Sequence, residues 1–320
     1  MVERIRIENF RCFRELEVPL RPLTVLIGPN DTGKSVFLRA IGILSSSESG
    51  FMDSDHWRLD HTITTRIVGS VDGGEITFNA VRGTKSYTSS GHANPKALQP
   101  CRLYQLPSNG VSMEAPGQPD HVGPPSLMRT GEGVPTLLDY FLRRDRARFN
   151  SIVTSCRGFV PGLEEIEVAT PDAPSRRLDL VIESDLRLKA DEASAGVRMM
   201  LFFLALAWHP EPPKMILIEE PENGVHPKRL ADVMRLLREI TQGKHGGHAA
   251  QIILTTHSPY LLDLVDLNRD QVLVFRRNDD GSRTADPVDA ERLAAFLDEF
   301  MLGEVWYNEG EAGLVGRSAS

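Results

Sequence analysis

The first hundred residues alternate apolar and polar positions over short stretches. Residues 4–8 and 16–20 place an apolar side chain at every second position, and residues 23–27 form a nearly continuous apolar run. Alternation with a period of two predicts strands with one buried face. We therefore expect an antiparallel pair that opens a sheet, and then a buried strand. From 62 to 106, short alternating pieces such as 75–80 and 101–106, separated by Gly, Asn and Ser, predict a small β-meander.

The middle of the chain changes character. Residues 107–135 are rich in Pro and Gly and have little periodicity, which predicts an irregular surface excursion and a change of lobe. Apolar residues at helical spacing follow in 137–142 and 149–156, and alternation returns in 177–183. We expect two helices and a hairpin there.

The second half alternates helical and strand patterns, as a parallel sheet requires. No internal repeat or heptad run is present, so we expect no coiled-coil arm. The expected elements are a helix at 197–208, a strand at 215–218, a helix at 228–240, a strand at 252–255, a helix from 260 and a strand at 272–275.

Composition narrows the class of protein. The chain has 320 residues, 41% of them hydrophobic, which suffices for one large or two ordinary domains. A net charge of −8 confines any DNA contact to a local surface. The three widely spaced cysteines form neither a disulfide framework nor a zinc pattern, which favours a reducing cytoplasm. We find no signal peptide and no segment long enough to span a bilayer, and so expect no membrane partner.

The stretch GPNDTGKS carries the clearest chemistry, because it follows the apolar run and precedes a helical pattern. A buried strand, a glycine-rich turn and a helix N-terminus in that order form a phosphate-binding loop, an agreement that a chance glycine turn lacks. Lys34 would reach the terminal phosphates, and Ser35 would give its hydroxyl to Mg²⁺. Gly28 and Gly33 would permit backbone angles and a close approach of the phosphates to the backbone that a side chain would obstruct. The nucleotide-binding residues are Gly28, Pro29, Asn30, Asp31, Thr32, Gly33, Lys34 and Ser35.

Two carboxylates follow the strand at 215–218, where open α/β sheets place their ligands. Beside the phosphate loop, Glu219 would hold Mg²⁺ through water and Glu220 would orient and deprotonate the attacking water. Successive strand residues face opposite ways, so both reach the nucleotide only if the strand ends there and the chain turns at Pro221. The alternative is a charged strand end in solvent.

Two further motifs are weaker alone. His257 in TTHSP follows another apolar strand and would contact a γ-phosphate or its attacking water, although a lone histidine is more often structural. In ASAGVR, Ser194 and Gly196 begin a helix and would present a hydroxyl and N–H groups to an anion, although a simple helix cap has the same pattern.

In this order, the motifs resemble those of the ABC-type ATPases of the RecF, SMC and OLD group, and the resemblance covers nearly the whole chain. It is closest to stand-alone AAA_21-type predicted ATPases. The resemblance implies an α/β P-loop NTPase fold of ABC type, with a mixed central sheet, an antiparallel N-terminal β-subdomain and a helical signature lobe. The matching stretches are IENFRCF (7–13), GPNDTGKS (28–35), ASAGVR (193–198), ILIEEPENGVHP (216–227), TTHSP (255–259), FLRRDRARF (141–149), FVPGLEEIEV (159–168) and LGEVWY (302–307).

The resemblance also implies a head-to-tail homodimer in the ATP state. Ser194 and Gly196 of one subunit would close over ATP that Lys34 and Ser35 of the other subunit hold. Residues 223–226 would cross the dimer seam. Hydrolysis would then require two chains.

Single residues gain roles in the same way. Glu220 corresponds to the catalytic base, Glu219 to the acid on the Mg²⁺ side, and His257 to the phosphate sensor. Arg11 and Cys12 match positions that touch the adenine. The implied cofactors are ATP and Mg²⁺.

The chain departs from the group in several places. Glu219 stands where aspartate is usual and is one methylene longer, so it can still accept a hydrogen bond from a metal-bound water. Ala193 replaces the leucine before the signature serine. Gln99 and Gln105 both remain candidates for the Q-loop glutamine. OLD-type nucleases carry a Toprim domain after the ATPase, and about 60 residues after His257 are too few for one. We expect no nuclease activity from this chain.

The target is the least determined property. We expect a single ABC-type ATPase domain over 1–320, with 1–107 and 210–320 as the nucleotide-binding lobe and 108–209 as the signature lobe. Its leading function is a Mg²⁺-dependent ATPase that acts on DNA, or on a DNA-acting effector, in DNA repair and maintenance or genome defence. A slow nucleotide-gated switch and, less favoured, a transport cassette are the alternatives. The basic run at 143–148 would bind phosphates or form a solvated helix face.

Overall fold

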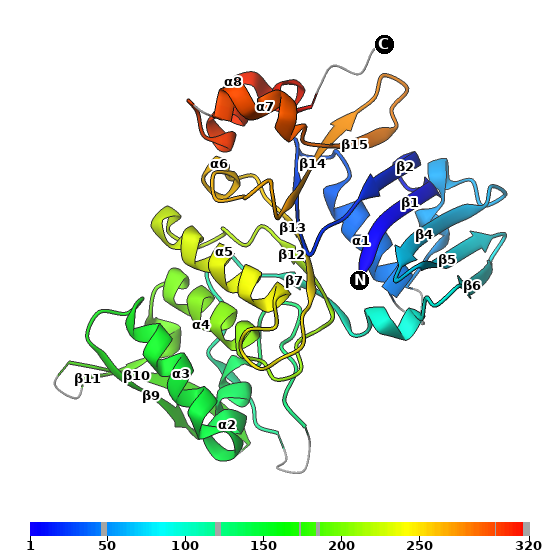
Figure 1. The fold of residues 1–320 in the computed structure, drawn as a ribbon. Helices are drawn as coiled ribbons and strands as arrows, with labels where there is room; N and C mark the ends of the chain where they lie inside the picture. Colours follow the sequence, from blue (N-terminus) through cyan, green and yellow to red (C-terminus); the bar gives the residue numbers. More distant parts are fainter. Residues whose placement is uncertain (46–49, 119–122, 173, 184–185, 298, 316–320) are drawn as a thin grey trace. The chain divides into compact units, whose positions relative to one another are not determined.

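The computed structural model describes residues 1–45, 50–118, 123–172, 174–183, 186–297 and 299–315 (Figure 1). By its internal contacts the chain forms two units. The first unit comprises 1–103, 213–220 and 250–320, and the second unit comprises 104–212 and 221–249. The lobes expected from the sequence differ from these units mainly at 221–249. The sequence places these residues in the nucleotide-binding lobe, whereas in the structure they group with the second unit.

The first unit contains a five-stranded antiparallel sheet in the order β2-β1-β4-β5-β6. The meander and the N-terminal strand pair are confirmed, but the pair joins this sheet and not that of the phosphate loop. The reason is exposure, because β1 and β2 alternate buried and exposed residues and need one solvent face. The strands are β1 (Val2–Phe10), β2 (Phe13–Pro19), β4 (Thr65–Val71), β5 (Gly74–Val81) and β6 (Thr84–Ser90).

A six-stranded mixed sheet holds the phosphate-loop strand, in the order β15-β14-β3-β13-β12-β7. Its strands β14, β3, β13 and β12 are parallel, and every residue of β3 is buried, as expected for a central parallel strand. Residues 101–105 form β7 here, so assigning them to the meander was wrong. The strands are β15 (Arg283–Pro287), β14 (Gln271–Arg277), β3 (Leu23–Ile27), β13 (Gln251–Thr255), β12 (Met215–Glu219) and β7 (Cys101–Gln105).

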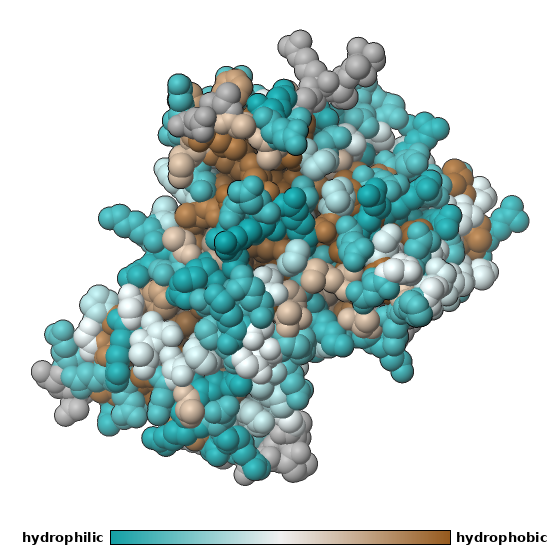
Figure 2. All heavy atoms as spheres, in the orientation of Figure 1, coloured by the Kyte–Doolittle hydropathy of each residue, from teal (hydrophilic) through white to brown (hydrophobic). Residues whose placement is uncertain are grey.

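Helices complete the first unit. Helix α1 (Lys34–Ser45) contacts strands of both sheets, so one apolar core joins them. The helix expected from residue 260 is a single turn, α6 (Pro259–Leu262), on which α8 (Leu302–Leu314) packs; α7 (Ala290–Leu297) precedes α8. Apolar surface is visible at these C-terminal helices (Figure 2). The side chains of Phe296 and Tyr307 are among the exposed ones there.

In its described residues, the second unit combines four helices with a small antiparallel sheet in which β10 pairs with β8, β9 and β11. The two helices and the hairpin expected before residue 183 are confirmed. Every residue of helix α4 from Met199 to Ala207 is buried, and the helix packs on α5. The elements are α2 (Val134–Arg144), α3 (Arg146–Arg157), α4 (Ala195–Ala207), α5 (Pro227–Thr241), β8 (Glu114–Pro116), β9 (Leu163–Ala169), β10 (Ser175–Ile182) and β11 (Leu186–Lys189).

Within the ranges described, no helix is long and apolar enough to cross a membrane. Short 3-10 turns occur at Asp53–Asp55, Trp57–Leu59, Pro95–Leu98 and Ala190–Glu192. The fold class predicted from the sequence is thus the one observed, a mixed central sheet with an antiparallel β-subdomain and a largely helical second unit.

Candidate nucleotide site

The phosphate loop lies between β3 and α1, and its two glycines are sterically required. Gly28 has φ +134°, and a Cβ on it would lie 2.3 Å from the carbonyl oxygen of Phe275. Gly33 has φ +100°, and its Cβ would lie 2.8 Å from the ring of Phe13. L side chains rarely adopt such φ values, so any larger residue would be both strained and crowded. The backbone therefore approaches its neighbours more closely than side chains would permit.

Lys34 folds back over this loop. Its Nζ donates to the carbonyl oxygens of Gly28 (2.6 Å) and Pro29 (2.8 Å), and the side chain is buried. Burial lowers the pKa of Lys34 to about 8, although nearby Glu220 and Glu311 oppose the shift. The ammonium thus lies inside the loop at the N-terminus of α1, where it can exchange carbonyl oxygens for phosphate oxygens.

The carboxylates of the second motif lie at the same edge of the sheet. Glu219, the last residue of β12, is opposite Thr255 on β13, and Thr255 is opposite Leu26 on β3. Glu220 has φ +47°, and its N–H donates to the Thr255 carbonyl oxygen (3.0 Å). The chain therefore leaves the strand direction at Glu220 itself, one residue before the turn expected at Pro221.

His257 lies beside Glu220, with 3.8 Å between His257 Nε2 and Glu220 Oε1. Burial lowers the pKa of His257, the positive charge of Lys34 lowers it further, and Glu220 opposes both. The imidazole is therefore neutral at neutral pH and keeps one donor and one acceptor nitrogen. Lys34, Glu220 and His257, from three separate parts of the sequence, thus act on one another electrostatically.

The residues present fit Mg²⁺ and a nucleotide. Ser35 is exposed in the first turn of α1, and Glu219 is half-buried at the end of β12. Mg²⁺ in phosphate sites is commonly held by one or two protein oxygens together with phosphates and water. Over the described ranges no three His, Cys, Asp or Glu side chains converge on a possible metal site. The Ser35 hydroxyl and the Glu219 carboxylate are oxygen donors of the kind that Mg²⁺ prefers.

Comparison with known proteins indicates the class of protein. Residues 106–263 match the AAA_21 family, described as "AAA domain, putative AbiEii toxin, Type IV TA system", and residues 1–76 match AAA_15, described as "AAA ATPase domain". The chain is 26% identical over 340 residues to the OLD nuclease of Thermus scotoductus, a match that covers 88% of this chain and 63% of the relative's length. These matches support an ABC-type ATPase of the RecF, SMC and OLD group.

Solved structures support the same fold at lower identity. An Smc head bound to the C-winged helix domain of ScpA has a TM-score of 0.61 and 13% identity, over 92% of this chain and 99% of that one. The SMC head domain from Thermotoga maritima has a TM-score of 0.53 and 15% identity, over 90% and 99% of the two chains. These values place the ABC-type ATPase among proteins of this fold.

The residues that we expect to form the signature belong to the second unit. Ser194 is the N-cap of α4 and accepts a hydrogen bond from the N–H of Val197 (3.3 Å), and the helix begins at Ala195. A Cβ on Gly196 would lie 3.4 Å from the carbonyl oxygen of Gly224. The start of the signature helix thus packs against the 223–226 segment.

Gln105 and the basic run at 143–148 form hydrogen bonds and ion pairs within the protein. Gln105, one of the Q-loop candidates, accepts a hydrogen bond from Arg129 Nε (2.7 Å). In the basic run, Arg143 pairs with Asp139 (2.7 Å) and Arg148 pairs with Asp145 (3.0 Å). The run is therefore partly engaged within the second unit.

The sequence analysis missed two residues that hold the loop region of this ATPase together. Asp55 is buried and pairs with Arg11 and with Arg39 of α1. Arg283 of β15 pairs with Asp31 of the phosphate loop (2.9 Å). Neither lies in a motif, and the partners are far apart along the chain, so no local pattern could have revealed them.

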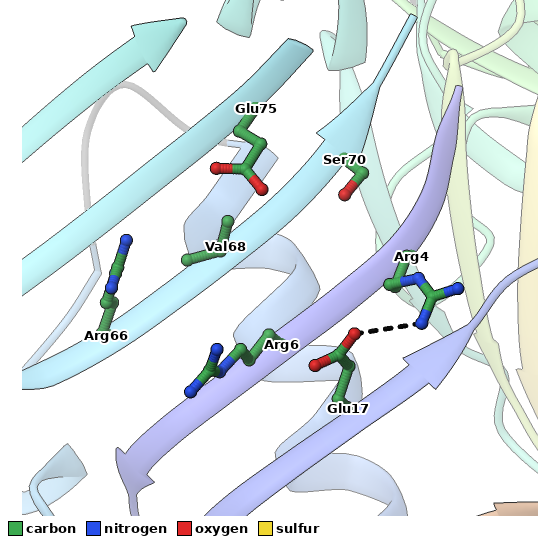
Figure 3. Close-up of a pocket in the computed structure, with 7 residues that line it drawn as sticks. All are labelled: Arg4, Arg6, Glu17, Arg66, Val68, Ser70 and Glu75. Atoms are coloured by element: carbon green, nitrogen blue, oxygen red, sulfur yellow. Dashed lines mark hydrogen bonds and ion pairs between the residues drawn. The ribbon is translucent and has the colours of Figure 1, made fainter. Parts of the chain in front are cut away.

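A hollow on the outer face of the five-stranded sheet does not resemble a nucleotide site (Figure 3). Arg4 in this hollow pairs with Glu17 (3.0 Å), and Arg6 pairs with Glu8 (2.7 Å) and Glu15 (3.4 Å). Since carboxylates match these arginines, the surface offers little net attraction for phosphate.

Proposed function

We propose that this protein binds and hydrolyses ATP with Mg²⁺, as an ATP-sandwiched head-to-tail dimer. The observation that carries the proposal is that Lys34, Glu220 and His257 meet at the carboxyl edge of the parallel strands. A cation, a carboxylate and a neutral imidazole beside a phosphate loop are the groups that phosphoryl transfer to water needs.

Each group has a distinct role in the proposed reaction. Lys34 neutralises charge on the terminal phosphate, which its position inside the loop supports. Glu220 orients the attacking water and accepts its proton. His257, uncharged at neutral pH, donates a hydrogen bond to the γ-phosphate or to the water. Mg²⁺, held by Ser35 and through water by Glu219, would neutralise charge on the phosphate oxygens.

The proposal includes a second subunit because the bound nucleotide would need the expected signature residues to complete its site. Ser194 and Gly196 at the start of α4 present a hydroxyl and backbone N–H groups suited to an anion. We propose that they close over the nucleotide of a second copy, with residues 223–226 at the seam. The monomer would then be catalytically incomplete.

The biological setting rests on the relatives. One matching family is described as a toxin family and one relative is named an OLD nuclease, which support a role in genome defence or in DNA repair and maintenance. We propose a cytoplasmic ATPase that acts on DNA or on a DNA-acting effector. Three free cysteines favour a reducing compartment.

The central test measures ATP turnover and mass together. The wild-type protein should hydrolyse ATP only with Mg²⁺, and Glu220→Gln should abolish turnover and accumulate as a dimer in ATP. Lys34→Ala should remain monomeric because it binds no nucleotide, and Glu165→Gln, at an exposed carboxylate of β9, should behave as wild type. A monomeric Glu220→Gln protein that still binds ATP would refute the sandwich.

A cellular assay separates turnover from a switch. If hydrolysis drives the function, Glu220→Gln loses it while the dimer persists. If ATP occupancy alone signals to an effector, the same variant retains or enhances it. Turnover measured with and without DNA shows whether DNA is a direct partner, and purification with membranes would favour a transport cassette.

A further inference from the structure

Asp55 stands out because it is a fully buried carboxylate with four donors. Its side chain is 0% exposed and accepts hydrogen bonds from Arg11 Nε, from Arg39 Nε (2.9 Å) and Nη2 (2.7 Å), and from the Met52 N–H (2.8 Å). A buried charge is costly unless it is paired and hydrogen-bonded, and here both carboxylate oxygens are occupied.

The balance of these effects keeps Asp55 ionised. Burial raises its pKa, but the hydrogen bonds from Arg39, the Met52 N–H and Arg11, with the charge of Arg39, outweigh burial and lower it. At neutral pH one negative charge therefore faces two guanidinium groups. The cluster retains a positive charge, and the side chains of Arg11 and Arg39 are 33% and 30% exposed.

The two arginines belong to two different parts of the phosphate-loop region. Arg39 is on α1, the helix that begins at Lys34. Arg11 is in the turn between β1 and β2, has φ +48°, and donates its own N–H to the Asp55 carbonyl oxygen (2.8 Å). Asp55 thus ties that turn to the helix through its backbone and its side chain.

The turn flanks the loop directly. A Cβ on Gly33 would lie 3.0 Å from Cys12 Sγ, so Cys12, the neighbour of Arg11 in the turn, lies against the loop. A nucleoside attached to those phosphates must leave the loop over one of its flanks. Arg11 offers a flat, half-exposed guanidinium there, whose face can stack on a base while its Nε bonds Asp55.

We propose that Asp55 is a positioning residue for nucleoside binding. It holds Arg11 at the flank of the phosphate loop, and Arg11 contacts the nucleoside. The inference rests on the proposed function, because it requires a nucleotide at the loop. Asp55 itself touches no nucleotide. It sets the preference for a nucleoside triphosphate over bare triphosphate.

The test compares two ligands that share phosphates and differ in the nucleoside. We measure dissociation constants for Mg-ATP and for Mg-tripolyphosphate by calorimetry on the full chain. Asp55→Asn should weaken ATP about tenfold and leave tripolyphosphate within about twofold, since a tenfold change is about 1.4 kcal/mol, the size of one charged hydrogen bond. Asp53→Asn, at an exposed carboxylate of the same 3-10 turn, should change neither.

Arg11→Ala provides the second arm, because it removes a half-exposed side chain and leaves Asp55 paired with Arg39. It should reproduce the loss of ATP affinity, and its combination with Asp55→Asn should cost no more than either change alone. If Asp55→Asn proves too unstable to assay, Arg11→Ala decides the question by the same comparison, the ratio of the dissociation constants for Mg-ATP and Mg-tripolyphosphate. Equal weakening of both ligands, or no change in either variant, overturns the inference. A wild-type protein that binds tripolyphosphate and ATP equally overturns it too, whereas a wild type that binds neither refutes the proposed function instead.

Discussion

The contact between Arg283 and the phosphate loop gives a prediction whose size follows from the structure. Arg283 Nε donates to the Asp31 carbonyl oxygen (2.8 Å), and its Nη2 bonds Asp31 Oδ2 (2.9 Å). The Arg283 side chain is 9% exposed and that of Asp31 is 89% exposed. Asp31 has φ +62°, a left-handed conformation that aspartate tolerates better than most residues but glycine adopts freely. Arg283 therefore holds a strained residue in place.

We expect Arg283→Ala to lower the free energy of unfolding by about 0.5–2.5 kcal/mol. The backbone hydrogen bond contributes about 0.5–1.5 kcal/mol, and the ion pair at most about 1 kcal/mol because the carboxylate is exposed. Asp31→Gly alone should be close to neutral, since relief of the left-handed strain offsets the lost ion pair. In that background Arg283→Ala should cost about 0.5–1 kcal/mol less than in the wild type, which is the coupling between contacting residues.

The assay is a double-mutant cycle by urea denaturation, with ATP affinity measured on the same four proteins. Arg283→Lys is the matched control, because it keeps the charge but loses the planar fork that reaches both oxygens. Additive costs for the two changes would refute the claim that Arg283 acts through Asp31. Unchanged ATP affinity in Arg283→Ala would show that the contact serves stability alone.

Other predictions follow from the same unit. Because burial lowers the pKa of Lys34 to about 8, ATP affinity should fall up to about tenfold from about pH 7 to about pH 9, with a flat profile in Lys34→Arg. In the nucleotide-free protein, Lys34 binds more protons in the unfolded state than in the folded state between about pH 8 and the ordinary lysine pKa of 10.5. Lys34 should therefore make the free energy of unfolding rise with pH over that interval. Its contribution is obtained by subtracting the profile of Lys34→Arg, and a contribution that falls with pH would contradict the burial of Lys34. Gly303→Ala should destabilise the protein by about 1–3 kcal/mol in thermal denaturation because its Cβ would lie 2.2 Å from the Pro259 carbonyl oxygen, whereas Gly42→Ala, with open space around it, should not destabilise; equal melting temperatures would refute the close approach. Burial raises the pKa of the Cys12 thiol to about 11, so iodoacetamide should modify it much more slowly than free glutathione at mildly alkaline pH, and equal rates by mass spectrometry would show a more exposed thiol.

The sequence by itself determined the elements and the chemistry that depends on local order. The apolar run at 23–27, the glycines at 28 and 33 and the lysine at 34 predict strand, loop and helix, because each needs only its neighbours along the chain. The carboxylates at 219–220 and the histidine at 257 were found the same way, each as a polar residue at the end of an apolar strand. Their roles remain predictions, but their meeting at one edge follows from the parallel order of β3, β13 and β12.

Only the tertiary structure decided which sheet each strand joins and what holds the loop. Strand periodicity reports how many faces are buried but not the partner, so β1, β2 and β7 were assigned to the wrong sheets. The contacts of Asp55 with Arg11 and of Arg283 with Asp31 join residues 44 and 252 positions apart. Ion pairs at such separations leave no periodic trace in one sequence, because any arginine and any aspartate can pair once the fold brings them together.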